Sequence, residues 1–453
     1  ILLDTDSYKL SHWVQYPPNT TSMYSYLESR GGKYGQTVMF GLQPILKRLE
    51  QGFTLADVEE ARDFAKAHGE PFNYDGWVAC FHAHGGKFPV RIKAVAEGTI
   101  VPVSNVLMSV ESTDPRFFWV VSYLETILMR MWYPITVATQ SWTIKQIIKG
   151  FLDRTSDDTD AEINFKLHDF GSRGVSSYES ACIGGAAHLT QFMGSDTMAG
   201  IRFANHYYKH SMAGFSIPAA EHSTITMWGR ERERDAYRNM IKQYGTGLFA
   251  VVSDSYDLFN ACANIWGKEL KAEVQGCGGM LVVRPDSGDP TTIVLKTLQT
   301  LDSTFGSSYN KKGFKVLNNV RVIQGDGINE DSIRSILETA VAAGFSASNI
   351  AFGMGGALLQ QVNRDTQKFA FKCSQATVDG HSVDVYKDPV TDSGKRSKRG
   401  KLDLIMRLEK GKQVISTIQG ESFGSLLRVV FENGKILKEY TLEEVRRNSM
   451  ETT

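Results

Sequence analysis

The sequence predicts an α/β protein with a central irregular (β/α) barrel and a mixed α+β domain formed from both chain ends. Between Phe165 and Asp365, short apolar runs alternate with helical patterns, and a polar, glycine-containing loop follows most runs. Such alternation is typical of βα units around a parallel sheet that is buried on both faces. Six units in succession favour a barrel, complete or irregular, over a small open sheet.

The six units follow one another along the chain. Their apolar runs and loops read "INFKL" with "HDFGSRG", "GFSIPAAEH", "LFAVV" with "SDSYD", "GMLVV" with "RPDSGDP", "NVRVI" with "QGDGINE", and "NIAFG" with "MGGALL". A helix is expected after "GFSIPAAEH", because Ile225 and Trp228 fall on one face and mixed charges follow. Ser223 or Thr224 would cap this helix and place His222 at its mouth.

Both ends of the chain are expected to form the second domain. The N-terminal part contains β-like runs such as "FPVRIKAVAEGTIVPV", and the C-terminal part contains "QVISTI" and "SLLRVVFENGKILKEY". Asn433 and Gly434 favour a hairpin turn in the last of these runs. We therefore expect a mixed α+β domain from residues 1–135 together with 375–453, and a barrel domain over 136–374.

The bulk composition argues against several classes of protein. Among 453 residues, 50 basic and 50 acidic side chains cancel, so no overall field attracts nucleic acid or an anionic membrane. Glu125 and Arg130 interrupt the longest apolar stretch, which argues against a membrane span. The start "ILLDTDSYKL" does not read as a signal peptide. Five widely spaced cysteines without a CxxC pair indicate a reduced, cytoplasmic protein.

Charged residues gather in the loops that follow the apolar runs. In barrels and open α/β sheets such loops lie at the carboxyl ends of strands and build the active site. Helix capping would explain some of the aspartates. Charged groups of both signs on one rim need partners, and a polar ligand is one way to supply them. The residues concerned are His168, Asp169, Arg173, His222, Asp254, Asp257, Arg284, Asp286 and Asp326.

Two glycine loops, "QGDGIN" and "FGMGGALL", each follow an apolar run and open a helix. Backbone N–H groups at such a junction bind phosphate, and the last loops of a barrel often do so. Alternatively, Gly325, Gly327, Gly353, Gly355 and Gly356 only permit tight turns. The sequence leaves both interpretations open.

The aspartates beside these loops suggest a ligand that carries oxygen groups. Asp254, Asp257, Asp286 and Asp326 could hold vicinal sugar hydroxyls, or some of them could share Mg²⁺, which prefers carboxylate oxygens and substrate phosphates. Each aspartate alone would more simply be a turn or cap residue. Together with a phosphate-binding loop they predict a phosphorylated sugar as ligand.

Two further clusters carry weaker signals. Cys80, His82 and His84 in "CFHAH" suggest zinc, but a zinc signature needs a second pair of ligands and none is visible. The basic run "KRSKRGK" (Lys395–Lys401) would by default be a solvated loop or a weak nucleic-acid patch. It could equally contact a polyanionic substrate.

The motifs together resemble the nicotinamide phosphoribosyltransferase family, dimeric type II phosphoribosyltransferases of NAD salvage. The resemblance runs in order from Leu3 to about Asn448. It is carried by "TDSYKLSH", "QYPPNT", "WYPITVAT", "KLHDFGSRGVSS", "GSDTMAG", "SIPAAEHSTIT", "VVSDSYD", "RPDSG", "VIQGDG", "IAFGMGG" and "KRSKRGK". The segment after Arg30 is shorter than in the animal enzymes, and Ser172 replaces a tyrosine there, so the resemblance is to a bacterial-type member.

The resemblance implies transfer of phosphoribose from 5-phosphoribosyl 1-diphosphate to nicotinamide, with Mg²⁺ present. Phe170 and Tyr8, the latter from the other subunit of a homodimer, would sandwich the pyridine ring, which orients it for attack. Arg173 and Asp196 would lie at the carboxamide. Asp196 would accept from the amide NH₂ and repel a nicotinate carboxylate.

The resemblance also assigns the remaining substrate groups. Arg284, Asp286 and Asp326 would hold the ribose, and Gly325, Gly355 and Gly356 would receive the 5-phosphate. The positions expected at the diphosphate and ATP phosphates are Arg30, Arg364, Lys372, Lys387 and Lys395. These cations would spread the charge of the leaving diphosphate.

His222 matches a histidine that ATP phosphorylates transiently, so the resemblance makes ATP a co-substrate. The resemblance implies that Asp257 and Glu221 orient its imidazole. Asp254, Asp257 and Asp286 are the expected carboxylates for Mg²⁺ bound with diphosphate.

Three other functions remain as alternatives. A nicotinate phosphoribosyltransferase on the same fold is disfavoured by Asp196. A barrel lyase or isomerase acting on a sugar phosphate would need a base such as lysine at a strand end, and no lysine stands in the strand-end motifs of the six units. A binding protein without catalysis would show no ATP-dependent turnover.

Overall fold

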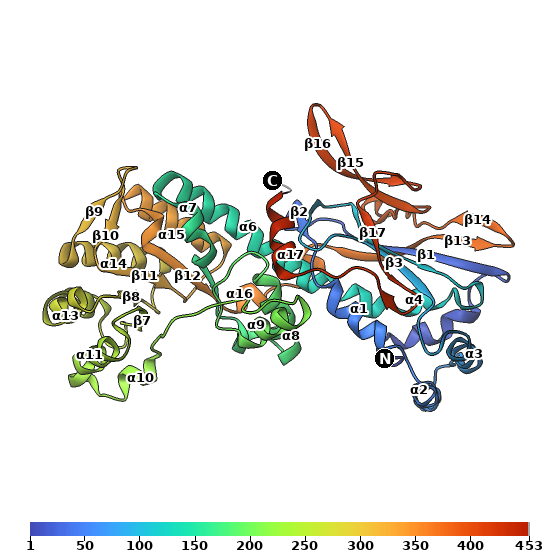
Figure 1. Ribbon diagram of the computed structural model, residues 1–453, viewed down its shortest axis with the longest axis horizontal. Helices are drawn as coiled ribbons and strands as arrows, with labels where there is room; N and C mark the ends of the chain where they lie inside the picture. The colour runs from blue at the N-terminus through green and yellow to red at the C-terminus, as the bar shows by residue number, and fades with distance from the viewer. Residues whose placement is uncertain (452–453) are drawn as a thin grey trace. The chain divides into compact units, whose positions relative to one another are not determined.

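The computed structural model describes residues 1–451, and the chain divides into two compact units (Figure 1). The first unit contains Ile1–Thr139, His206–His210 and the chain from Asn363 onward, and the second contains Gln140–Asn205 and Ser211–Val362. The sequence-based division placed residues 363–374 in the barrel domain. These residues belong to the first unit because a strand that begins at Phe369 pairs with the N-terminal strand.

The first unit is built on a seven-stranded antiparallel sheet of order β14-β13-β1-β5-β3-β17-β18. Both chain ends contribute to it, as the long-range pairing of Tyr26 with Lys372 illustrates. In sheet order the strands are His381–Asp384, Phe369–Val378, Thr20–Ser29, Val106–Ser112, Val90–Val95, Leu427–Glu432 and Lys435–Ile436. Two smaller pairs are β2 (Gln36–Val38) with β4 (Ile100–Pro102), and β15 (Leu402–Glu409) with β16 (Lys412–Gln419).

Helices accompany this sheet and share an aromatic core with it. Trp77 and Phe88 are fully buried, and Phe53 packs against both. Most of these helices are short. They are α1 (Leu42–Gln51), α2 (Leu55–His68), α3 (Tyr74–His84), α4 (Val120–Tyr123), α5 (Glu125–Met129) and α17 (Leu442–Glu451), and the unit boundary falls within α6 (Trp132–Thr155).

The second unit contains a five-stranded parallel sheet of order β6-β12-β11-β8-β7. In that order the strands are Leu167–Asp169, Ile350–Met354, Val320–Gln324, Met280–Arg284 and Leu248–Val252. The α/β class and the parallel sheet are therefore confirmed. The apolar runs become strands because they are buried, with Phe249, Leu281 and Phe352 fully inaccessible.

Helices precede, connect or follow these strands, and all but α12 are labelled in Figure 1. They are α7 (Thr159–Glu162), α8 (Tyr178–His188), α9 (Met198–Tyr207), α10 (His222–Thr226), α11 (Glu233–Tyr244), α12 (Leu258–Asn260), α13 (Lys271–Gly276), α14 (Pro290–Phe305), α15 (Glu330–Ala342) and α16 (Gly356–Leu359). A π-helix covers Ala261–Glu269, and β9 (Ser307–Tyr309) pairs with β10 (Lys315–Leu317).

The six units predicted a central barrel, complete or irregular, and the structure has a half-barrel parallel sheet of five strands. Five units supply strands, whereas the "GFSIPAAEH" segment makes only single parallel bridges, Gly194 with Phe215 and Ala219 with Ala250. Pro218 lacks an N–H and cannot donate to a strand ladder, so this segment does not form a regular strand. Its carbonyl still accepts from Ala250 N at 2.9 Å.

No helix within residues 1–451 is both long enough and apolar enough to cross a membrane.

Candidate active site

The predicted rim exists at the carboxyl ends of the parallel strands. Phe170 follows β6, Asp254 follows β7, Arg284 ends β8, and glycine loops follow β11 and β12. A pocket of about 540 Å³ opens beside Phe170 and Arg284. Its lining is Phe170, Ser172, Arg173, Asp196, Ala219, Ala220, Glu221, His222, Ser223, Val252, Arg284 and Asp286.

His222 is the first residue of α10 and is held by two neighbouring strand ends. Its Nε2 lies 2.8 Å from Oδ1 of Asp254, and its Nδ1 lies 3.9 Å from Oδ2 of Asp286. Ser287 donates its hydroxyl to the other oxygen of Asp254. The imidazole is 47% exposed, so it is oriented yet remains accessible from the pocket.

The prediction that Asp257 orients His222 needs correction. Asp257 is the N-cap of α12 and accepts from Asn260 N at 2.9 Å, whereas Asp254 makes the hydrogen bond to the imidazole. Both aspartates lie in "SDSYD", and sequence alone did not separate the residue facing the rim from the one that turns back to cap a helix.

Glu221 occupies the N-cap position of α10, one residue before His222, where Ser223 or Thr224 was expected. Its backbone N–H donates to the hydroxyl of Thr224 at 3.3 Å, and its carboxylate accepts from Ser223 at 2.6 Å. These bonds fix the start of the helix. Glu221 therefore positions His222 through the backbone.

Phe170 is held by close packing on glycine. A Cβ atom at Gly353 would lie 1.9 Å from the Phe170 ring, so only glycine lets the ring settle on β12. The guanidinium of Arg284 stands 5.6 Å from the ring centroid and donates to Asp286 at 2.9 Å. The glycine loop around Gly353 predicted a tight turn or a phosphate site, but in the structure Gly353 admits this ring.

Arg173 and Asp196 line the same pocket from two different loops. Arg173 lies in the 3-10 turn Ser172–Gly174, and Asp196 is exposed and accepts from the hydroxyl of Ser216. The backbone N–H of Asp196 donates to the carbonyl of Asp169 at 2.9 Å, which ties the Asp196 loop to the end of β6.

Asp169 lies beneath the pocket and is fully buried. Its carboxylate accepts from Gly171 N at 2.7 Å. Burial raises its pKa to about 6, and Asp196 nearby adds to the rise. Its place after an apolar run predicted a rim residue like the other charged side chains, whereas the structure buries it completely.

A larger, mostly apolar cavity of about 690 Å³ shares Phe170, Asp196 and Arg284 with the rim pocket and extends along the parallel sheet. Ile217, Val282, Ile323 and Ala351 line it. His168 also lines this cavity, and desolvation lowers its pKa, so its imidazole favours the neutral form.

The two glycine loops stand at the adjacent ends of β11 and β12. Gly355 precedes α16, and a Cβ at Gly356 would meet no atom within 4 Å, so open space lies over this backbone. Asp326 is exposed, and its carbonyl accepts from Gln324 at 2.9 Å. A Cβ at Gly325 would approach the Phe170 ring to 3.3 Å, so this loop borders the ring as well.

Four of the five predicted phosphate-binding cations interact electrostatically within the first unit. The pKa of Lys372 is lowered by desolvation and by the positive charges of Arg30, Lys387 and Arg364. We call these four residues the cationic cluster. Lys395 instead stands 3.7 Å from Asp392.

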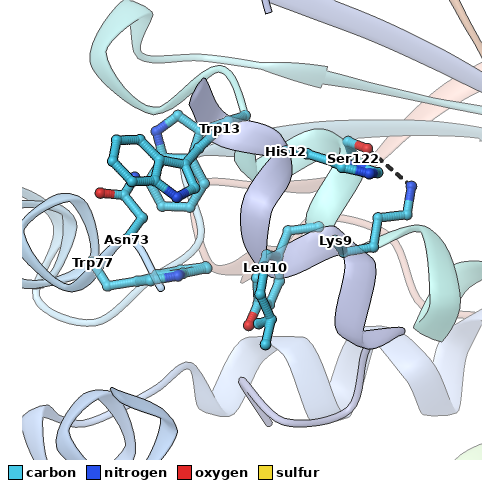
Figure 2. A pocket seen from close by; sticks show the side chains of 9 residues that line it. Lys9, Leu10, His12, Trp13, Asn73, Trp77 and Ser122 are labelled. Atoms are coloured by element: carbon cyan, nitrogen blue, oxygen red, sulfur yellow. Dashed lines mark hydrogen bonds between the residues drawn. The ribbon is translucent and has the colours of Figure 1, made fainter. Parts of the chain in front are cut away.

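Tyr8 lies on the 3-10 helix Ser7–Val14 of the first unit, and its side chain is 57% exposed. The neighbouring Lys9 anchors this helix through a 3.0 Å hydrogen bond to Ser122 (Figure 2). Lys9 also forms an ion pair with Glu125. The ring of Tyr8 touches that of His12 edge to face, with centroids 4.8 Å apart.

No group of three or more His, Cys, Asp or Glu side chains within the described chain is arranged to hold a metal ion. Asp254, Asp257 and Asp286 therefore do not form a preassembled three-ligand site. The "CFHAH" cluster is not one either. Burial raises the pKa of Cys80 to about 12. His84 is hydrogen-bonded through Nε2 to a carboxylate oxygen of Asp114 at 2.8 Å.

Solved structures establish which fold this is. The chain is similar to a nicotinate-nucleotide pyrophosphorylase from Pyrococcus furiosus, with TM-score 0.63 and 17% identity over 99% of this chain and 93% of that one. It is similar also to human nicotinic acid phosphoribosyltransferase, with TM-score 0.58 and 16% identity over the same shares. The chain thus shares the fold of these two proteins.

Sequence comparisons show the family to which the chain belongs. Residues 165–435 match the nicotinate phosphoribosyltransferase (NAPRTase) family, and residues 1–92 match the N-terminal domain of nicotinamide phosphoribosyltransferase. The nicotinamide phosphoribosyltransferase of Xanthomonas campestris is 56% identical over 99% of this chain and 98% of its own length. That of Acinetobacter baylyi is 31% identical over 98% and 95%. The chain belongs to the nicotinamide phosphoribosyltransferase branch of the NAPRTase family.

Proposed function

We propose that the protein transfers phosphoribose from 5-phosphoribosyl 1-diphosphate to the ring nitrogen of nicotinamide, giving nicotinamide mononucleotide and diphosphate in NAD salvage. The observation that carries the proposal is the nearly full-length similarity to nicotinamide phosphoribosyltransferases, at 56% identity in one case. The rim pocket also provides an aromatic ring, Phe170, and charged side chains that would bind the two substrates.

Nicotinamide would lie against Phe170. A flat aromatic face orients a neutral ring and sets its nitrogen for attack. Asp196 would accept from the carboxamide NH₂, whereas a nicotinate carboxylate there would meet like charge. Arg173 would donate to the carboxamide oxygen.

The phosphoribosyl group would occupy the neighbouring strand ends. Arg284, Asp286 and Asp326 would bind the ribose, and the backbone of Gly325, Gly355 and Gly356 would receive the 5-phosphate. The cationic cluster, together with Lys395, would bind the diphosphate and the ATP phosphates. Positive charge at the leaving group favours departure as the ribose becomes oxocarbenium-like.

A Mg²⁺ ion bound with diphosphate fits this rim. Mg²⁺ usually takes one or two protein carboxylates and completes its shell with phosphate oxygens and water. Asp286 would be its protein ligand, since both oxygens of Asp254 already accept hydrogen bonds, from His222 and Ser287, and Asp257 is the cap of α12. When bound, the ion would neutralise part of the diphosphate charge.

ATP would phosphorylate His222. Asp254 accepts from Nε2–H and so favours the tautomer that keeps a lone pair on Nδ1. Nδ1 would attack the γ-phosphorus, the N–P bond would form, and the bond to the β-phosphate oxygen would break with release of ADP. Water would later hydrolyse the phosphohistidine, coupling ATP hydrolysis to synthesis.

A homodimer is part of the proposal, with Tyr8 of the second copy closing over the nicotinamide ring. The five cysteines are all free thiols, which is consistent with a reducing compartment such as the cytoplasm.

A second candidate is a nicotinate phosphoribosyltransferase, because the family that matches residues 165–435 carries that name. Asp196 disfavours it through charge repulsion.

The decisive test is mononucleotide formation from 5-phosphoribosyl 1-diphosphate with nicotinamide or nicotinate, with and without ATP. We expect turnover of nicotinamide only, stimulated by ATP in the native protein and not in His222→Ala. Preference for nicotinate would overturn the role of Asp196. Loss of all turnover in both assays would overturn the proposed function.

A further inference from the structure

Glu28 is a buried acid beside the cationic cluster. It stands near the end of β1, and its side chain is only 3% exposed. One carboxylate oxygen accepts from Nε of Arg30 at 3.2 Å, and the other forms an ion pair with Lys398. No motif in the sequence points to a role for Glu28.

The partners of Glu28 are connected to the rest of the cluster. The backbone N–H of Lys398 donates to the hydroxyl of Tyr26 at 2.8 Å, which fixes this point of the basic run on β1. The adjacent Ser397 exchanges two hydrogen bonds with the backbone of Lys387, at 2.8 and 3.0 Å. Holding Lys398 therefore holds Lys387 as well.

Arg30 has donors to spare in this arrangement. Its Nη2 is buried and has no hydrogen-bond partner among residues 1–451, while Nε is fixed by Glu28. A buried donor without a partner is costly, and an anion oxygen would satisfy it. The guanidinium is thus oriented with a free donor before any anion arrives.

We propose that Glu28 is a positioning residue that clamps Arg30 and Lys398 and thereby sets the affinity of the cationic cluster for a diphosphate group. The identity of the physiological anion rests on the proposed function. The clamp itself rests only on contacts within the first unit.

The direction in which diphosphate affinity changes when Glu28 is neutralised distinguishes a positioning role from a purely electrostatic one. If Glu28 only diluted the positive charge of the cluster, neutralising it would tighten anion binding by Coulomb attraction. If it positions the cations, the same change lets two long side chains rotate freely, and anion binding weakens. The substitution Glu28→Gln distinguishes these outcomes because it removes the charge and keeps the shape.

Glu111 provides a matched control on the neighbouring strand β5. It likewise forms two ion pairs, one with Arg91 at 3.2 Å and one with Lys401 at 2.8 Å. Lys401 belongs to the same basic run as Lys398. Neither of these cations belongs to the cationic cluster. Glu111→Gln therefore removes an ion pair to the basic run without releasing Arg30.

The experiment is calorimetric titration of the full-length protein with inorganic diphosphate, followed by steady-state kinetics. For Glu28→Gln we expect diphosphate Kd and the KM for 5-phosphoribosyl 1-diphosphate to rise by about ten-fold or more, with the KM for nicotinamide little changed. Glu111→Gln should stay within about two-fold of the native values, and Glu28→Asp should recover part of the loss. Tighter binding in Glu28→Gln, or equal losses in both glutamine variants, would overturn the proposal.

Thermal unfolding checks that each variant is folded. If Glu28→Gln does not fold, Lys398→Gln opens the clamp from its partly exposed side, and we expect the same rise in diphosphate Kd. Unchanged binding there would equally refute the clamp. Diphosphate binding does not need turnover, so a protein whose diphosphate affinity depends on Glu28 but which makes no mononucleotide would refute the proposed function alone.

Discussion

The role proposed for Asp254 rests on its contact with the imidazole of His222. Its hydrogen bond to His222 Nε2 favours one imidazole tautomer and would stabilise the charge that develops when Nδ1 attacks phosphorus. We expect Asp254→Asn to lower the ATP-stimulated part of the rate by about 10- to 100-fold, while nicotinamide turnover without ATP changes little. Transfer of labelled γ-phosphate from ATP to the protein, measured alongside both rates, checks this.

Asp257→Ala is the control for that prediction. It removes the cap of α12 and should destabilise the fold by about 1 kcal/mol, yet it should leave ATP stimulation intact. Loss of phosphoprotein in Asp257→Ala together with its retention in Asp254→Asn would contradict the assignment.

The residue types of the site could be predicted from sequence, but not their pairings. The rim position of Asp254, Arg284 and Asp286 follows from their place after apolar runs, because parallel strands end at one edge. Whether Asp254 or Asp257 faces His222 depends on the backbone path of a short turn. No periodic pattern encodes that path.

At the level of the element, β6 and the turn after it depend on the buried carboxyl of Asp169. Burial raises its pKa from 3.8 to about 6. A raised folded-state pKa means that the contribution of Asp169 to stability is fully present below pH 3.8 and is lost as pH rises through about 6. The ionised form is thus the less stable one in the folded protein.

Asp169→Asn tests this reasoning, because asparagine keeps an acceptor for Gly171 N and cannot ionise. Between pH 4 and pH 7.5 the free energy of unfolding of the native protein should fall relative to that of the variant by about 2–3 kcal/mol. Urea unfolding of both proteins across this range measures the difference. A difference that stays constant with pH would show that Asp169 does not titrate in this way.

The elements that sequence predicted poorly are those in which local chemistry departs from a pattern. "INFKL" reads as one apolar run, but residues 163–165 form a 3-10 turn and the strand begins only at Leu167. "GFSIPAAEH" is apolar enough for a strand, yet Pro218 interrupts its donors, and the sheet stops short of a full barrel.

At the scale of the whole molecule, the pairing of the two chain ends was predictable and one insertion was not. Residues 206–210 belong to the first unit although the chain around them belongs to the second. Tyr208 donates to the buried carboxylate of Glu97 at 2.6 Å, and Leu442 N donates to the Tyr208 carbonyl at 2.9 Å. Such a buried polar contact between distant residues leaves no periodic trace in the sequence.

The proposed homodimer makes the strongest demand on the whole molecule, since each nicotinamide site would combine Phe170 of one chain with Tyr8 of the other. Tyr8→Ala and Phe170→Ala should each bind nicotinamide poorly. In a mixed dimer one site would carry both defects and the other neither, so unfolding and refolding the two variants together should restore about a quarter of native activity.

The matched control pairs two defects that belong to the same site. Phe170→Ala mixed with Asp196→Ala gives dimers in which every site keeps one defect, so no activity should return. Nicotinamide turnover of both mixtures, compared with each variant refolded alone, gives the result. Recovery only with Tyr8→Ala would establish that Tyr8 acts across the interface, because a residue serving its own chain could not be complemented in this way. Failure to recover activity in a mixture shown to contain mixed dimers would instead place Tyr8 in its own chain's site or outside any site.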